Sequence, residues 1–118
     1  MTKKEINREI AEKHMGWHEV SYAPMMSPMM HAHWWADITG YKWYLVKEFD
    51  PMHRIDHAMM ALEKFPQWEL RKDTWGDNRV TYSCDIVNPD FEHFTKSMAT
   101  AQEAICLAVL EAVKGKED

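Results

Sequence analysis

The chain has 118 residues, the length of one ordinary domain, and we expect a single domain over residues 1–118. A hydrophobic fraction of 46% with six tryptophans excludes an intrinsically disordered chain. The formal net charge of −5 argues against binding of extended nucleic acid, because that requires a stripe of basic residues along the phosphates. A small anionic ligand needs only a few basic side chains.

Cysteine usage and hydropathy indicate the compartment. Cys84 and Cys106 form neither a C-x-x-C pair nor the pattern of a disulfide-stabilised domain, so we expect two reduced thiols. The charged start MTKKEINREIAEK is not followed by a secretory hydrophobic region, and no apolar run is long enough to span a bilayer. These features predict a cytoplasmic protein without membrane contact.

The first segment, TKKEINREIAEKHMG, has the signals of an amphipathic helix. Ile6 and Ile10 lie one turn apart and make a narrow apolar stripe. Thr2 followed by Glu5 is typical of a helix N-cap, and Gly16 stands where a helix would stop. The pattern predicts a helix over residues 2–16.

Residues 17–49 show no sustained periodicity and contain Pro24 and Pro28. Gly40 indicates a turn, and residues 41–46 after it are typical of a short strand. The remainder of this segment is predicted to be a long connection. Connections of this length are usually functional or packed against the domain.

A second helix is predicted over residues 51–65. Asp50 and Pro51 are suited to the N-cap and first helical position, and Pro66 ends the helix. One face carries the apolar residues Ile55, Ala58, Met59, Leu62 and Phe65. The opposite face, expected to meet solvent or a partner, carries His53, His57, Met60 and Lys64.

The second half of the chain predicts an antiparallel hairpin followed by a helix. Apolar and polar residues alternate over 68–71 and again over 79–86, and DTWGDN between them is a turn. The stretch FEHFTKS adds a short irregular strand. Thr100 and Glu103 then open a helix over residues 100–115 as a capping box. This helix is apolar on nearly all sides, so we expect it to be covered on more than one side and to promote homo-oligomerisation.

Several segments together resemble the phage ABA-sandwich domain family. They occur in the right order along most of the chain, and EAICLAVLEAV is the most specific; the others are EINREIAEKHMGW, WWADITGY, DPMHRIDHAMMALEKF and the hairpin. The resemblance implies an α+β fold in which about three helices are layered with a small antiparallel sheet. It also implies a viral origin, hence the cytoplasm of an infected host, and no particular activity.

The run MMSPMMHAHWWAD, residues 25–37, is the most unusual stretch. Its methionines and histidines include the soft ligands that Cu(I) favours. Methionine also fills irregular gaps and packs favourably beside aromatic rings. We favour packing, because neither fixed ligand spacing nor a supporting carboxylate is visible. His53 and His57 have the spacing of a zinc protease motif, but Arg54 replaces the glutamate that would serve as base.

Catalysis is not expected, and we name no catalytic residue, metal ligand or cofactor. The nineteen acidic residues are scattered over helix faces and turns, and both cysteines lie at apolar positions. The glycine motifs of phosphate-binding loops and the nucleophile elbow do not occur. A metal-assisted hydrolase remains a third alternative, which requires a carboxylate near at least three of His31, His33, His53, His57 and His93.

Ligand capture is the specific hypothesis. The aromatic residues lie beside the basic Lys42, Lys47 and Arg54, and such rings and charges can stack on a base and pair with a phosphate. By analogy with small phage proteins that sequester nucleotide signals of bacterial immunity, we predict a non-enzymatic sponge for a nucleotide-like anion. One alternative is that the aromatics only cover the core, and another is an accessory or assembly protein acting through protein contacts. The predicted ligand-binding residues are His31, His33, Trp34, Trp35, Tyr41, Lys42, Trp43 and Arg54.

Overall fold

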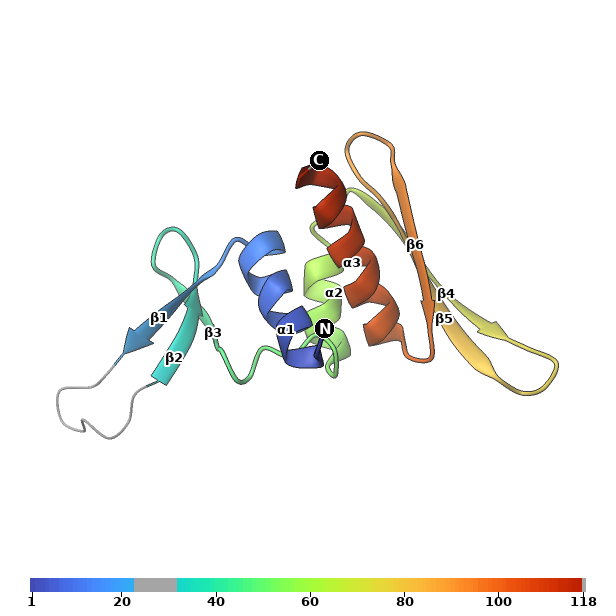
Figure 1. Ribbon diagram of the computed structural model, residues 1–118, viewed down its shortest axis with the longest axis horizontal. Coiled ribbons are helices and arrows are strands. Elements are labelled where there is room, and N and C mark those ends of the chain that lie inside the picture. The colour runs from blue at the N-terminus through green and yellow to red at the C-terminus, as the bar shows by residue number, and fades with distance from the viewer. Residues whose placement is uncertain (23–31, 118) are drawn as a thin grey trace.

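The computed structural model describes residues 1–22 and 32–117. Within these residues, three helices form a middle layer between two three-stranded antiparallel sheets (Figure 1). The predicted α+β class is confirmed, and one of the two sheets was not foreseen. The radius of gyration is 16.3 Å, whereas a compact domain of this length has about 13.5 Å. The molecule is elongated because each sheet projects from an opposite side of the helices.

The N-terminal helix forms where the sequence predicts it. Helix α1 spans Lys3–Glu9 and continues as a π-helical segment, η1, over Ile10–His14. The Thr2 hydroxyl accepts a hydrogen bond from the Glu5 backbone N–H at 3.2 Å, which confirms the N-cap. Gly16 ends the segment with a φ of +74°, a conformation that glycine adopts without strain.

The first sheet, called the small sheet below, is built from residues 18–45. Its strands are β1 (His18–Tyr22), β2 (Ala32–Ala36) and β3 (Lys42–Leu45), paired in that order. The strand predicted over 41–46 is confirmed. Strands β1 and β2 were missed because the alternation in HEVSY is brief and AHWWA has two adjacent tryptophans. The pairing of β2 with β3 shifts register between Trp35 and Ala36.

Helix α2 is shorter than predicted and spans Ile55–Leu62. Asp50 is not its N-cap. The Asp50 carboxylate instead accepts hydrogen bonds from Asn7 and His53. The chain makes a further turn after Asp50, and Arg54, which has an extended backbone, is the N-cap of α2.

The predicted faces of α2 are also partly wrong. Ile55 is 45% exposed, whereas His57, assigned to the outer face, is only 2% exposed. The physical reason is that the segment after β3 folds back over the first turn of α2. Tyr44 and Phe49 thereby pack on His57, with ring centroids 4.7 Å and 5.4 Å away. Leu62 is buried and Lys64 is exposed, as predicted.

The second sheet, called the large sheet below, contains the predicted hairpin. Its strands are β4 (Gln67–Thr74), β5 (Val80–Val87) and β6 (His93–Met98), paired in that order. Strand β6 is regular rather than irregular, and it pairs with β5 along its whole length. Cys84 and Ile86 of β5 are fully buried against the helices. The hairpin of β4 and β5 projects beyond the helices (Figure 1).

Helix α3 (Ala101–Glu117) lies at the centre of the molecule. The Thr100 hydroxyl accepts from the Glu103 N–H and donates to the Glu103 carboxylate, which confirms Thr100 as the N-cap and its pairing with Glu103. One side of α3 packs on β5 and β6, and another packs on α2 and η1. Its apolar residues, including Ile105 and Val109, are therefore covered within one chain, so α3 gives no reason to expect oligomers. No described helix is long and apolar enough to cross a bilayer.

Candidate functional site

The principal concave site, called the cleft below, lies between α1, the small sheet and the loop that follows β3. Its volume is about 990 Å³, which is within the usual range for small-molecule sites. The cleft is lined by Lys3, Lys4, Asn7, Arg8, Glu19, Ala32, His33, Trp34, Trp35, Leu45, Val46, Lys47, Phe49, Asp50 and His53. Four of these side chains are cations, and two are carboxylates.

Arg8 is held by a network of side chains on one wall of the cleft. Its guanidinium donates to Glu12 at 2.9 Å and to Glu19 at 3.1 Å, and it lies 5.2 Å from the ring centroid of Trp35. These carboxylates raise the pKa of Arg8 above its ordinary value. His33 Nδ1 lies 3.2 Å from the other oxygen of Glu19. The network fixes the position of the small sheet relative to α1.

Asp50 organises the opposite wall. Its carboxylate accepts from Asn7 at 2.8 Å and from His53 Nδ1 at 2.9 Å. Burial alone would raise the pKa of Asp50, but these hydrogen bonds hold it below the ordinary value. Asn7 also accepts the Met52 backbone N–H at 3.1 Å. The turn after β3 is thus fastened to α1, so this wall is preformed.

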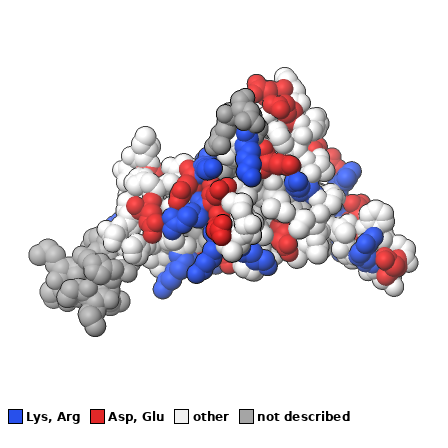
Figure 2. Space-filling view, in the orientation of Figure 1, with Lys and Arg blue, Asp and Glu red and all other residues white. Residues whose placement is uncertain are grey.

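Lysines supply the available positive charge. Lys3 Nζ lies 3.4 Å from His53 Nε2, the nitrogen left to accept when Nδ1 donates to Asp50. Lys4 of α1 and Lys47 of the loop after β3 also line the cleft. Among the described residues, neither lysine has a carboxylate partner. Figure 2 shows basic side chains around the junction of the small sheet and the helices, interleaved with acidic ones. The three ammonium groups can therefore meet an incoming anion.

The structure brings three of the predicted ligand-binding residues, His33, Trp34 and Trp35, to the cleft. Trp35 is 1% exposed, so its ring belongs mainly to the core and supports Arg8. Trp34 is more accessible and offers an apolar surface to a ligand. His31 and the Met25 to Met30 methionines lie outside the described residues.

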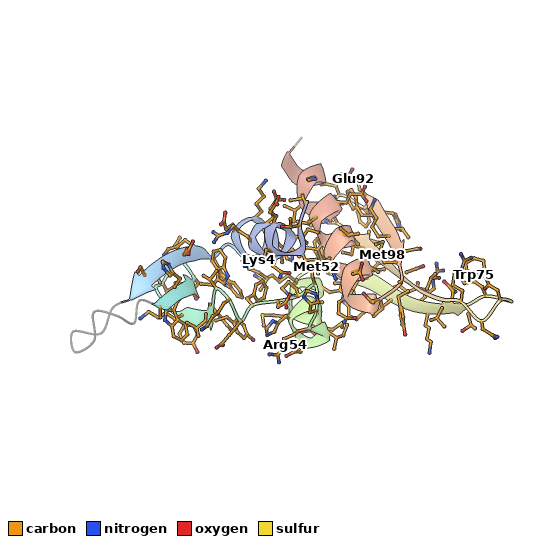
Figure 3. All side chains as sticks on the ribbon, turned by 60° about the horizontal axis from the view of Figure 1, so that its bottom comes forward. Lys4, Met52, Arg54, Trp75, Glu92 and Met98 are labelled. Atoms are coloured by element: carbon orange, nitrogen blue, oxygen red, sulfur yellow. The ribbon has the colours of Figure 1, made fainter. Side chains whose placement is uncertain are left out.

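The other predicted residues lie elsewhere. Tyr41 and Trp43 are beside the turn between β2 and β3, where Trp43 stacks on Trp17 at 5.9 Å and donates to Asp37 at 3.1 Å. Lys42 begins β3 and does not line the cleft. Arg54 pairs with Asp56 at 3.0 Å at the start of α2, away from the small sheet (Figure 3).

Trp17, Tyr44, Phe49 and His57 form an aromatic cluster that joins the small sheet to the helices. Phe49 lies 5.0 Å from Trp17 and 5.4 Å from His57. His57 Nδ1 accepts the Asp50 backbone N–H at 3.0 Å, so this nitrogen is unprotonated. Burial lowers the pKa of His57, which favours its neutral form. The cluster contains none of the predicted ligand-binding residues, and its rings pack between the small sheet and the helices.

The histidines proposed as ligands of a hydrolytic metal are spread over the molecule. His93 pairs with Asp85 in the large sheet, whereas His33 and His53 are in the cleft and His57 is in the aromatic cluster. In residues 1–22 and 32–117, no group of three histidine, cysteine or acidic side chains is placed to hold a metal ion. Burial also raises the pKa of both thiols, Cys84 and Cys106, to about 12.

A family model, the phage ABA sandwich domain, matches residues 8–110. The chain belongs to this family. Comparison with curated proteins and with solved structures gives no match. The matched range of the phage ABA sandwich domain contains both sheets and most of the helical layer. It begins at Arg8, so the cleft residues Lys3, Lys4 and Asn7 precede it.

Sequence reasoning missed four residues that give the cleft of this ABA sandwich domain part of its charge and its fixed wall, namely Lys3, Lys4, Asn7 and Asp50. Lys47 was noted as a basic side chain beside the tryptophans, but it was not among the predicted ligand-binding residues. One signal was available. Lys3 and Lys4 occupy the first turn of a helix, where positive charge is unfavourable because it opposes the helix dipole. Such a placement favours a role outside the helix itself. The meeting of Lys47 with Lys3 and Lys4 of α1 could not be predicted, because it depends on the long-range fold.

Proposed function

We propose that the cleft binds a small anionic ligand of nucleotide type. The observation that carries this proposal is the pair of lysines, Lys4 and Lys47, that face one cleft without carboxylate partners among the described residues. Lys3 adds a third ammonium group nearby. Lysine ammonium groups pair with phosphate oxygens as point charges, and their number suits a phosphate or a phosphodiester.

The rest of the lining supports a ligand with both an apolar part and charge. Trp34, Leu45 and Val46 contribute apolar surface. Binding sites of this kind combine mostly apolar walls with a few polar groups that fix the orientation of the ligand. A base or nucleoside beside Trp34, with its phosphate toward the lysines, satisfies both requirements.

We further propose that the ligand is sequestered rather than converted. The two carboxylates of the cleft already bind Arg8, Asn7 and His53, so neither is an uncommitted base. In a phage family, capture of a nucleotide signal of the bacterial host would counter immunity without catalysis. This role rests on analogy, and the ligand class is the part that the geometry supports.

The experiment is thermal unfolding of the purified full-length chain with a panel of probes. The probes are cyclic AMP, cyclic di-GMP, ADP-ribose and pyrophosphate, each with and without zinc or copper. A ligand that binds only the folded state raises the unfolding free energy by RT ln(1 + [L]/Kd), so about 2.7 kcal/mol is expected at one hundred times Kd. Recovery of the unchanged nucleotide after heating supports sequestration. Recovery of a cleaved product overturns it.

Matched variants locate the site. Lys4→Glu and Lys47→Glu should each weaken binding about tenfold, because each replaces an attraction by a repulsion in the cleft. Lys114→Glu makes the same change at an exposed position of α3 and should leave the affinity unchanged. Equal effects of all three variants would point to general charge, and no stabilisation by any probe would reject the proposal.

A second candidate function is an accessory or assembly protein that acts through protein contacts. The observation that favours it is the projecting edge of the large sheet, where β4 pairs on one side only within the described residues. Unpaired strand edges are templates for further strands. This candidate does not exclude ligand binding, because the cleft lies beside the small sheet, whereas β4 belongs to the large sheet on the other side of the helical layer (Figure 1).

A further inference from the structure

Strand β4 is an unusually long edge strand for a domain of this size. It spans eight residues and pairs only with β5 in the part of the chain that the structure describes. The hairpin that contains it projects from the helices, with Trp75 at its tip (Figure 3). Natural proteins usually shorten, cover or distort such an edge, because its free N–H and C=O groups pair readily with another strand.

The inner face of β4 is incompletely covered. Helix α3 packs on β5 and β6, and β4 lies beyond it. Trp68, which points to the same face as the partly buried Leu70, is therefore 37% exposed. If this edge pairs with another strand, part of the apolar surface of Trp68 is removed from water, which is favourable.

The outer face of β4 carries charges of both signs. Glu69 and Arg71 lie on this face, and their side chains approach within 3.8 Å. Both side chains are well exposed, so each can form an ion pair with a strand that joins the edge of β4. Figure 2 shows both signs of charge on the projecting hairpin.

We propose that a second copy of this chain pairs with β4 in antiparallel register about a two-fold axis at Leu70. In that register Leu70 faces Leu70 of the second copy, and Glu69 faces Arg71. The symmetry repeats the Glu69–Arg71 pair, so two opposite-charge pairs form on the outer face. On the inner face, Trp68 lies opposite Lys72, a cation–π arrangement.

Of the registers centred on Glu69, Leu70 and Arg71, only the one centred on Leu70 satisfies the charges of the outer face. In a continuous sheet, directly opposite residues lie on the same face. The next possible register therefore shifts one strand by two residues, which moves the two-fold axis by one residue. An axis at Arg71 places Arg71 opposite itself and Glu69 opposite Asp73. An axis at Glu69 places two glutamates opposite each other. Like charges in direct opposition are destabilising, so both neighbouring registers are disfavoured.

Sedimentation velocity of the full-length protein, without ligand, tests the pairing. The wild-type chain should dimerise with increasing concentration. Glu69→Arg and Arg71→Glu should each raise the dimer dissociation constant about tenfold or more, because each turns two attractive pairs into repulsive ones. The double variant Glu69→Arg/Arg71→Glu restores opposite charges and should recover the wild-type constant. Glu63→Arg, an equal change at an exposed position off the edge, is the control.

Cysteine cross-linking tests the register. Glu69→Cys and Arg71→Cys should each remain uncrosslinked alone under mild oxidation and should form a disulfide dimer when mixed. Cys84 and Cys106 are buried, and the wild-type chain supplies the background. Cross-linking of Arg71→Cys alone would indicate the neighbouring register and reject the proposal. A wild-type chain that stays monomeric, or a double variant that fails to recover the dimer, would reject it as well. These outcomes are independent of ligand binding in the cleft.

Discussion

The two sheets of this protein are attached to the same helical layer by different chemistry. The large sheet is attached by buried apolar side chains, such as Ile86 of β5 and Ile105 of α3, in one continuous core. The small sheet is attached by the aromatic cluster and by Arg8, which bridges Glu12 and Glu19 above Trp35. Aliphatic packing is non-directional, whereas rings and ion pairs fix orientation. The difference explains why the cleft with its charged side chains lies beside the small sheet.

The largest expected effect is in the packing of the large sheet. Ile86→Ala removes a fully buried side chain and should lower the free energy of unfolding by about 2–5 kcal/mol. Ile38→Ala makes the same substitution in the turn between β2 and β3, at a residue that is 94% exposed, and should change the free energy of unfolding by less than about 0.5 kcal/mol. Denaturant unfolding monitored by circular dichroism measures both. Similar losses would contradict a core centred on the large sheet.

A smaller effect separates the two sheets by their dynamics. Trp43→Ala removes a ring stacked on Trp17 and a hydrogen bond to Asp37, and should destabilise the small sheet by about 1–2 kcal/mol. Amide hydrogen exchange should accelerate in β1–β3 and stay unchanged in β4–β6.

Trp75→Ala is the matched control for that experiment. Trp75 is also about half exposed, and it donates to Thr81 at 3.0 Å within the large sheet. Its loss should accelerate exchange only at the tip of the β4–β5 hairpin. If Trp43→Ala also accelerates exchange in β5, the two sheets unfold as one unit and the comparison fails.

The difference between the large sheet and the small sheet also determined what could be predicted from the sequence. The large sheet and α3 carry strong local signals, because Val80, Tyr82, Cys84 and Ile86 alternate with polar residues and Thr100 opens a capping box. The small sheet has strands of only four or five residues, which are too short to show a periodic pattern. Its tryptophans were noted, but nothing local indicated that Trp35 packs under Arg8 or that Trp43 stacks on Trp17.

The candidate site was predictable only in part for the same reason. His33, Trp34 and Trp35 are contiguous, so their shared location at the cleft was foreseen. Lys4 and Lys47 meet there only because the turn at Asp50 is fastened to Asn7 of α1. A hydrogen bond between such distant residues follows from tertiary structure, and no local pattern encodes it.

The smallest expected effect is a pH dependence that originates in the aromatic cluster. His57 is neutral in the folded chain, because burial lowers its pKa and its Nδ1 accepts the Asp50 N–H. The unfolded chain binds a proton at His57 near the ordinary value of 6.5, while the folded chain resists it. This contribution to stability is therefore fully present above about pH 6.5 and is lost as the pH falls toward the lower, folded pKa. The lowered pKa of Asp50 acts only in a more acidic range, below its ordinary value of 3.8.

Unfolding free energies measured between pH 7.5 and pH 5 isolate the histidine. His57→Asn keeps an acceptor near the position of Nδ1, since the amide oxygen replaces the ring nitrogen, but it removes the titrating group. The variant should lose part of the dependence on pH in this interval, whatever its stability at pH 7.5. A slope that His57→Asn leaves intact would mean that the junction of the small sheet with the helices does not control the response to acid.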